Sequence, residues 1–383
     1  MHQIDVSKGQ TISTVSQQWA NRSPDERFTS LGELRKQVAL WADQSFAEEV
    51  QPNKMHVGAS EGGGLHLIAN DALLDLTNFS FQQVARLADA PANYLRGLPA
   101  PLAALNLNYG LKAAQPKTHS LYMRNDAEDR LLRGVTSPRY GRIFDRDVVD
   151  AVMAVAGDGT GDTRWKVPGT IDWGSQHGVS YNPQVDITKE NTTLYASDRD
   201  IFLFLVDDMN PIEVGKLASG APDLMFRGFY VWNSEVGQRT FGVATMYLRG
   251  VCQNRNLWGV EDFSEITFKH SAGAPERFVE MAAPALHTYA EANTQKLVAG
   301  VKAAKAAKLA KNDEERIEFF GKFGFSEKQA RGLIATSLAE EGVPPVSAWD
   351  FAQAVSAQAR KAPFQEQRLA LEMTAGKILD KVI

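Results

Sequence analysis

The chain has 383 residues, of which 44% are hydrophobic and 23% are charged, a balance typical of a globular protein with two or three domains. Its single cysteine, Cys252, excludes a disulfide within one chain and a zinc site built from several cysteines. The formal net charge of -5 excludes a globally basic nucleic-acid binder, although a local basic strip remains compatible with it.

Two further classes are excluded by the absence of long apolar segments. No run of about 18 apolar residues occurs, so we expect no membrane span. The N-terminal string MHQIDVSKGQ lacks a basic start followed by an apolar run, and we therefore expect no signal peptide.

The chain begins with two loosely patterned segments. Residues 1–64 predict an N-terminal helical and irregular segment, in which Leu31, Leu34 and Val38 recur at helical spacing. The glycine-rich string GASEGGG ends this segment. Residues 65–118 then predict a short helical segment that leads into the core.

Residues 119–272 predict an α+β core domain. The runs 120–124 and 131–136 indicate a strand pair around a polar turn. The apolar run 200–206 predicts a central strand that is covered on both faces. The segment 240–255 fits both a strand and a helix, and its β-branched and aromatic residues favour the strand. We therefore predict a central, mostly antiparallel sheet with packed helices, followed by an all-helical C-terminal domain.

Residues 273–383 are predicted to form that helical domain. The stretch 276–311 is consistent with one long helix that carries a row of lysines. Spaced mostly by three residues, such a row would form a slanted positive ridge that could follow a phosphate backbone. A solvated helix face is the more frequent explanation. The row consists of Lys296, Lys302, Lys305, Lys308 and Lys311.

Arginines cluster around the turn between the predicted strand pair and the next helix. A guanidinium matches phosphate oxygens, and a tyrosine ring among the arginines offers a stacking surface for bases. The alternative is a solvated turn whose arginines pair with nearby acids such as Asp129 and Asp145. The residues predicted to hold phosphates and stack bases are Arg133, Arg139, Tyr140 and Arg142.

A second candidate lies in the stretch 226–259, which combines aromatics, Arg and Asn but has no paired carboxylates and no nucleophile–base pair. This mixture favours gripping a polymer over bond-breaking chemistry. Arg249, Asn254 and Arg255, at its far end, would flank a binding groove. A strand with aromatics on both faces is usually part of a core, so that interpretation also stays open.

Signals for an enzyme are weak. The seven histidines are scattered, and no HExxH, GxSxG or Walker-type motif occurs. Asp207 and Asp208 follow the predicted central strand, where metal-binding acids can lie, so a metal-dependent nuclease is a third class to consider. We favour a non-catalytic protein with no catalytic residue, no metal and no cofactor.

Several short motifs together give the chain a family resemblance. It resembles the phage/plasmid-like protein family, also called domain of unknown function 932. That resemblance implies a mobile element in the cytoplasm of a bacterial host, and it supplies no catalytic residue. The matching motifs are NFSFQQVA (78–85), PANYLRGLP (91–99), RGVTSPRY (133–140), NSEVG (233–237), RGVCQN (249–254) and Lys269-His270.

The predicted order of elements is also distantly similar to the core of single-strand annealing recombinases, which form rings or helical filaments. That similarity implies a homo-oligomer with single-stranded nucleic acid as its partner. The leading prediction is thus a non-catalytic protein that binds nucleic acid, most simply single-stranded DNA, in phage or plasmid recombination or replication. The alternative is a host-interaction or counter-defence protein that binds another protein.

Overall fold

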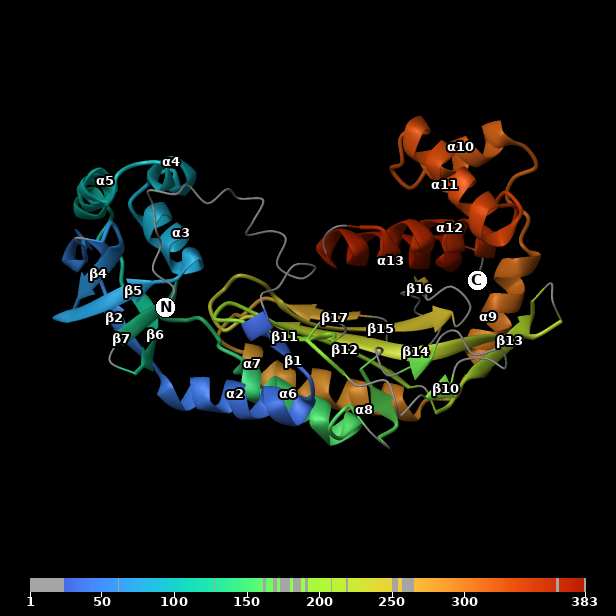
Figure 1. Cartoon of the computed structure of the whole chain (residues 1–383), viewed down its shortest axis with the longest axis horizontal. Coiled ribbons are helices and arrows are strands. Elements are labelled where there is room, and N and C mark those ends of the chain that lie inside the picture. Colours follow the sequence, from blue (N-terminus) through green and yellow to red (C-terminus); the bar gives the residue numbers. More distant parts are fainter. Residues whose placement is uncertain are drawn as a thin grey trace.

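The structure is a computed structural model, and it confirms the predicted α+β class (Figure 1). Two large sheets define two lobes, which we call the small lobe (residues 45–136) and the large lobe (the other described residues). The described residues are 24–60, 62–127, 129–160, 163–167, 171–172, 180–181, 187–189, 192–207, 209–217, 220–249, 254–256, 265–362 and 365–381.

The small lobe is a six-stranded mixed sheet with the order β2-β6-β7-β5-β4-β3, and three helices pack against it (Figure 1). The β5–β7 pair is parallel and the other pairs are antiparallel. Thr77 caps α3 by accepting a hydrogen bond from the backbone N–H of Ser80. The elements are β2 (Ser45–Val50), the 3-10 helix Pro52–Lys54, β3 (His56–Ala59), β4 (Leu65–Ala69), β5 (Ala72–Leu76), α3 (Asn78–Leu87), α4 (Ala92–Arg96), α5 (Ala100–Ala113), β6 (His119–Asp126) and β7 (Asp129–Thr136).

The large lobe contains a nine-stranded sheet in the described part of the chain, with the main order β1-β11-β12-β14-β15-β16. Its centre confirms two predictions. Strand β12 is buried along its whole length between β11 and β14, and the ambiguous segment after residue 240 forms strand β15. The strands are β1 (Arg27–Phe28), β8 (Trp165–Lys166), β11 (Leu194–Ala196), β12 (Ile201–Asp207), β13 (Ile212–Lys216), β14 (Pro222–Asn233), β15 (Phe241–Arg249), β16 (Asn254–Asn256) and β17 (Glu265–Phe268), with β9 (Ile171–Asp172) and β10 (Ser180–Tyr181) as a separate pair.

Helices cover both faces of the large sheet (Figure 1). In that view α2, α6, α7 and α8 lie below the sheet, whereas α12 and α13 lie above it. The Tyr230 hydroxyl donates a hydrogen bond to the Glu372 carboxylate, which fixes α13 over the upper face. The helices are the 3-10 helix Pro24–Glu26, α2 (Leu31–Gln44), α6 (Asp145–Ala156), α7 (Ala274–Arg277), the π-helix Phe278–Ala282, α8 (Ala283–Glu291), α9 (Gln295–Ala306), α10 (Asp313–Gly321), α11 (Glu327–Glu341), α12 (Ala348–Arg360) and α13 (Gln365–Asp380).

The small lobe is an insertion into the large lobe. The chain leaves helix α2 at Gln44, builds the whole small sheet, and returns to the large lobe at helix α6. Helices α2 and α6 pack against each other, so the two crossing points of the chain are close together (Figure 1).

The predicted domain boundaries do not separate structural units. The boundary at residues 64/65 falls between β3 and β4, which pair in one hairpin, and the boundary at 118/119 divides β5 from its partner β7. The boundary at 272/273 precedes α7 and α8, but Phe278 and Leu286 share a hydrophobic core with the large sheet. Composition along the chain cannot show these pairings, because they join segments that are distant in sequence.

The predicted single helix over residues 276–311 is wrong. Helix α8 ends at Glu291 and helix α9 ends at Ala306. Beyond α9, the Leu309 N–H donates to the Val346 carbonyl, and Lys308 forms a β-bridge with Ser347. Tertiary pairing thus overrides the high helix propensity of this Ala/Lys-rich segment.

Candidate functional site

Arg133 lies inside the protein and not on an open surface, which corrects its predicted role as a phosphate contact. Its Nη1 donates to Glu235 Oε2 at 2.6 Å, and both side chains are almost fully buried. Burial alone would lower the pKa of Arg133, but the Glu235 carboxylate, Tyr122 and Asp145 raise it above the ordinary value. Arg133 therefore stays charged and neutralises a carboxylate from the other lobe.

Arg142 and Tyr140 are also engaged within the protein. The guanidinium of Arg142 lies 3.7 Å from the centroid of the Tyr122 ring, and its Nη1 donates to the Glu235 carbonyl. The Tyr140 hydroxyl donates to the Ser234 carbonyl at 2.7 Å, and its ring stacks on His270 with centroids 4.9 Å apart. The predicted roles of these two side chains as open contacts for phosphates and bases are therefore corrected, because both already make contacts within the protein.

These contacts form one buried network, centred on Glu235. The Glu235 carboxylate accepts from the Asp145 N–H at the start of α6 (2.9 Å), from Arg133, and from the Tyr122 hydroxyl (3.3 Å). Burial, and then the neighbouring Glu235, raise the pKa of Tyr122 to about 12. Burial and Glu235 also raise the pKa of Asp145 well above its usual value. Charges from both lobes are thus compensated at one junction.

Two glycines allow the chain segments at this junction to approach closely. A Cβ on Gly134 would lie 2.6 Å from Val236 Cβ, and a Cβ on Gly141 would lie 1.8 Å from the Ser271 carbonyl oxygen. Gln83 completes the contact, because its Nε2 donates to the Val236 carbonyl at 3.1 Å and its Oε1 accepts from the Val135 N–H at 2.7 Å. The motif segments around residues 83, 134, 236 and 270 therefore meet in space.

The second candidate cluster is also neutralised internally. Arg249 forms a two-pronged ion pair with Asp223 (2.8 and 3.3 Å) and donates to Glu341 at 2.8 Å. Lys305 Nζ lies 2.8 Å from the same Asp223 carboxylate. Burial opposes the ionised form of Asp223, but Arg249 and Lys305 hold its pKa below the usual value. The predicted roles of Arg249 and Lys305 at a polymer surface are therefore corrected.

Other candidates are exposed or lie outside the described residues. Lys302 and Lys308 are exposed, but the end of α9 at Ala306 means that they do not share one helical ridge. The backbone of Asn254 and Arg255 forms β16, whereas their side chains lie outside the described residues. Cys252 and Asp208 also lie outside them.

Asp207, which the sequence suggested as a metal-binding acid of a nuclease, is buried at the end of β12. Its carboxylate accepts hydrogen bonds from Arg164 Nε at 2.7 Å and from Asn210. Within the described part of the chain, no group of three His, Cys, Asp or Glu side chains could hold a metal ion. The Asp207 carboxylate thus acts as a structural partner of Arg164.

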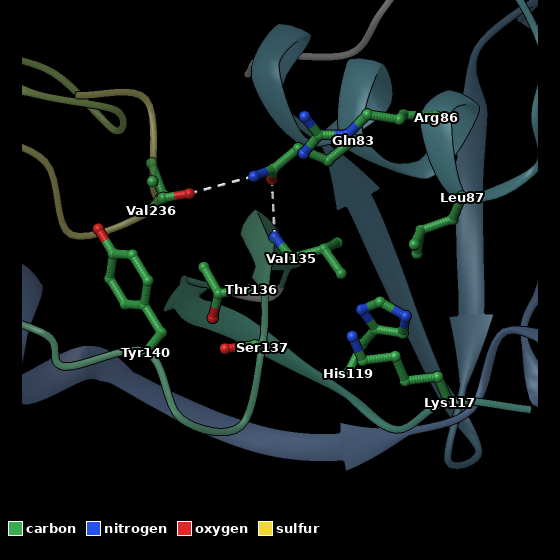
Figure 2. Close-up of a pocket in the computed structure, with 11 residues that line it drawn as sticks. Gln83, Arg86, Leu87, Lys117, His119, Val135, Thr136, Ser137, Tyr140 and Val236 are labelled. Carbon is green, nitrogen blue, oxygen red and sulfur yellow. Dashed lines mark hydrogen bonds between the residues drawn. The ribbon is translucent and has the colours of Figure 1, made fainter. Parts of the chain in front are cut away.

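Of the predicted arginine cluster, Arg139 has an exposed side chain. It lies on the turn 137–140, which the Tyr140 N–H closes by donating to the Ser137 carbonyl at 3.0 Å. Beside this turn is a pocket of about 320 Å³ (Figure 2). Its lining comes from both lobes and consists of Gln83, Arg86, Leu87, Lys117, His119, Val135, Thr136, Ser137, Tyr140, Val236 and Gly237.

The charged side chains of the lining are basic. Arg86 at the end of α3 and Lys117 before β6 are exposed, His119 opens β6, and no carboxylate belongs to the lining. Burial, and then the positive charge of Lys117, lower the pKa of His119. The lining therefore carries positively charged side chains and no negatively charged one, with Arg139 on the adjoining turn.

Sequence reasoning did not single out Arg86, Lys117 or His119. Arg86 lies at the end of α3, whereas Lys117 and His119 lie just before and at the start of β6, and only the small-lobe fold brings these two segments together. The RGVTSPRY motif adjoins the pocket, because its Thr136, Ser137 and Tyr140 form part of the lining.

Comparison with known proteins does not assign a function to this site. No family model, curated protein or solved structure matches the chain, so the resemblance to the phage/plasmid-like family stays a prediction. Within the described residues, the helices are all too short or too polar to cross a membrane.

Proposed function

We propose that the protein is a non-catalytic, homo-oligomeric nucleic-acid-binding protein that holds a single strand during phage or plasmid recombination or replication in a bacterial cell. The observation that carries this proposal is that Arg86 and Lys117 belong to the lining of one pocket that has no carboxylate, with the exposed Arg139 on the adjoining turn. Exposed cations on one local surface are the footprint expected for phosphate contacts.

These three exposed cations, Arg86, Lys117 and Arg139, which we call the basic rim, replace the basic strip that the sequence predicted. Buried Arg133 and Arg249 hold the fold together, whereas the rim cations extend into solvent. Phosphate contacts of this kind give binding that weakens with salt, with a slope of about -0.7 per contact on single strands. A local basic rim is compatible with the net charge of -5, because 0.1 M salt largely screens the interaction between exposed charges that are more than about 10 Å apart.

The test is a fluorescence anisotropy titration with labelled single-stranded and double-stranded oligonucleotides at several salt concentrations. We expect salt-dependent binding of the single strand, and we expect the triple variant Arg86→Gln, Lys117→Gln, Arg139→Gln to lose about two units of salt slope. The matched control is Lys328→Gln, which removes an exposed lysine from α11 and should bind like the unmodified protein.

Two measurements complete the test. Absence of binding to any strand at low salt would refute the proposal. The double variant Lys302→Gln, Lys308→Gln tests the lysines that the sequence predicted. Its salt slope of strand binding should stay unchanged if the phosphate contacts are made by the rim cations instead. Mass measurement with and without DNA tests for an oligomer.

A protein partner is the second candidate, and one surface favours it. Helix α5 exposes Leu102, Leu105 and Tyr109, which follow one another at spacings of three and four residues and therefore share one face. Tyr94 of α4 is also exposed, at 62%. A host protein that co-purifies with the unmodified chain but not with the Leu105→Glu, Tyr109→Glu variant would support this function over strand binding.

A further inference from the structure

Helix α5 has an apolar outer side that the rest of the described chain leaves uncovered. Leu102, Leu105 and Tyr109 follow one another at spacings of three and four residues, so they lie on one side of the helix, and Tyr109 is 80% exposed. The opposite side, which includes Leu107, packs in the core of the small lobe. We call Leu102, Leu105, Tyr109 and the following Lys112 the α5 ridge.

The α5 ridge lacks the charges of an ordinary solvated helix face. Lys112 is the one charged residue among the 14 residues of α5, and it forms no ion pair within the described residues. The solvent side of a helix in a globular protein normally carries charged and polar side chains, and adjoining exposed apolar side chains mark interaction sites. The ridge therefore fits a partner surface that is apolar and has negative charge at one end.

The opposite face of the small sheet carries an apolar pair of its own. Leu67 and Leu74 belong to the core beneath the helices. Their neighbours in β4 and β5, Ile68 and Leu73, therefore lie on the other face, since side chains alternate along a strand. Ile68 and Leu73 are direct partners in the strand register, and Leu73 is 59% exposed. Figure 1 shows α3, α4 and α5 together on one side of this sheet, so the pair is directed away from them.

That face of the sheet is covered over one half. On its β6 side the Arg124 guanidinium lies 4.9 Å from the centroid of the Trp41 ring, so helix α2 covers this half. On its β3 side the His66 ring lies across Gly58, because a Cβ on Gly58 would be 2.2 Å from His66 Nε2. No helix of the described chain covers Leu73 there. A helix placed on the open half would complete the layer that α2 begins.

Two carboxylates adjoin the exposed pair. Asp75 follows Leu73 on the same face of β5. Burial, and then the neighbouring Asp129, raise the pKa of Asp75, whereas His66 opposes that rise. Neither carboxylate forms an ion pair within the described residues. We call Ile68, Leu73, Asp75 and Asp129 the open sheet patch, and it complements the α5 ridge in polarity and in charge.

The two surfaces also agree in spacing. If Leu105 lies against Leu73, the rise of the helix places Lys112 about 10 Å further along α5, and the rise of the strand places Asp75 about 7 Å further along β5. A lysine side chain spans the difference. Because ridge and patch lie on opposite faces of one sheet, they cannot meet within one chain, and two copies cannot exchange both contacts at once.

We propose that the α5 ridge of one copy of this chain packs on the open sheet patch of a second copy, so that the copies assemble head to tail. Such a contact joins two different surfaces, and its repetition builds a ring or an open filament. The proposal rests on the homo-oligomer of the proposed function, and it does not require strand binding. The ridge is small beside the roughly 20–30 residues per side of a standard interface, so assembly should depend on protein concentration.

The experiment is sedimentation velocity of the full chain over a series of protein concentrations. The unmodified chain should grow beyond a dimer as the concentration rises. L105E disables the ridge and L73R disables the patch, and each should raise the concentration needed for assembly about tenfold or more. Both positions are exposed, so circular dichroism should show an unchanged fold. The control K328E changes an exposed lysine of α11 and should assemble like the unmodified chain.

A mixture of L105E and L73R identifies the type of contact. One intact ridge and one intact patch remain in the mixture, so dimers of the two variants should form and grow no further. Pairing of one α5 with another would instead be blocked by L105E, left intact by L73R and not restored in the mixture, and that pattern overturns the proposal.

The charged end of the contact has its own variants. K112E places a carboxylate against Asp75 and Asp129, so it should raise the concentration needed for assembly, and the added change D75K should reverse part of this shift. Assembly of K112E at the same concentration as the unmodified chain overturns the pairing as described.

The failures of the two proposals are distinguishable. A chain that stays monomeric at every concentration overturns the head-to-tail contact, even when it binds a strand or captures a host protein through α5. An oligomer that is unaffected by L105E and L73R uses another surface and also overturns this contact, while the homo-oligomer of the proposed function stands. If the chain assembles in a manner sensitive to both variants but binds no strand, strand binding is overturned and the head-to-tail contact stands.

Discussion

The RGVTSPRY motif and its immediate neighbours contain two kinds of arginine. Arg133 is buried and Arg142 is partly buried, and both contact Glu235, whereas Arg139 is exposed on the intervening turn. The partner of Arg133 is 102 positions away along the chain, not among the acids that flank it in sequence. The difference teaches that one arginine-rich motif can contain both an arginine that joins two lobes and an arginine that extends into solvent, and that charge density along the sequence does not distinguish them.

The largest effect on stability should come from removing the buried arginine, Arg133. Arg133→Met leaves the Glu235 carboxylate buried without its main counter-charge, and we expect a loss of roughly 3–5 kcal/mol in the free energy of unfolding. Urea denaturation followed by circular dichroism measures this loss. Arg331→Met on the exposed face of α11 removes an ion pair with Glu327 and should cost far less, because exposed pairs contribute little. Equal losses in the two variants would contradict the buried role.

A smaller loss of stability should follow from adding a side chain where Gly141 closely approaches Ser271. Gly141→Ala places a Cβ 1.8 Å from the Ser271 carbonyl oxygen, so the turn must shift, at a cost of roughly 1–3 kcal/mol. Gly332→Ala in α11 meets no atom within 4 Å and should stabilise the helix by about 0.5–1 kcal/mol. The same denaturation assay distinguishes the two signs. A stability of Gly141→Ala above that of the unmodified chain would show that the approach is looser than described.

The pH dependence of stability sharpens the comparison further. The folded-state pKa of Asp145 is raised by burial and by Glu235, so its contribution is fully present below the unfolded pKa of about 3.9 and is lost as the pH rises through the folded value. Asp145→Asn resembles the protonated form and can still accept from Asn233 Nδ2. Relative to the unmodified protein, this variant should therefore become more stable as the pH rises from about 4 towards neutrality. A constant difference across that range, in denaturation at several pH values, would argue against a raised pKa.

The smallest effect on stability should come from replacing the exposed arginine, Arg139. Arg139→Gln should leave the free energy of unfolding unchanged within error, because the side chain extends into solvent. It should instead lower the salt slope of single-strand binding by about 0.7 if Arg139 contacts one phosphate. A large loss of stability together with an unchanged slope would assign Arg139 to the same structural role as Arg133.

Local patterns predicted the elements of the fold better than their partners. Alternation and apolar runs identified β6, β7, β12 and β15, since these signals depend on burial of nearby residues along one strand. The extent of α9 could not be predicted in this way, because its end depends on pairing with the segment around Ser347. The α+β class followed from elements alone, whereas the boundaries required knowledge of which strands pair.

The candidate site was predicted only in part, for the same reason. Thr136, Ser137 and Tyr140 lie in a motif that attracted attention, so the neighbourhood was found. Arg86 and Lys117 belong to segments without a chemical pattern and become relevant through the packing of α3 beside β6. Whether an arginine is paired depends on tertiary contacts, and sequence neighbours such as Asp129 gave the wrong partner for Arg133.

The insertion of residues 45–136 between two packed helices has a consequence for dissecting the molecule. Since α2 and α6 are adjacent, a short linker from Gln44 to Ser137 could replace the cassette of residues 45–136 without separating these two helices. Such an excision would strip Glu235 of Arg133 and leave Asp145 beside it, so the remaining body would carry an uncompensated negative core. A shortened protein without this cassette should therefore also carry neutral replacements of Glu235 and Asp145.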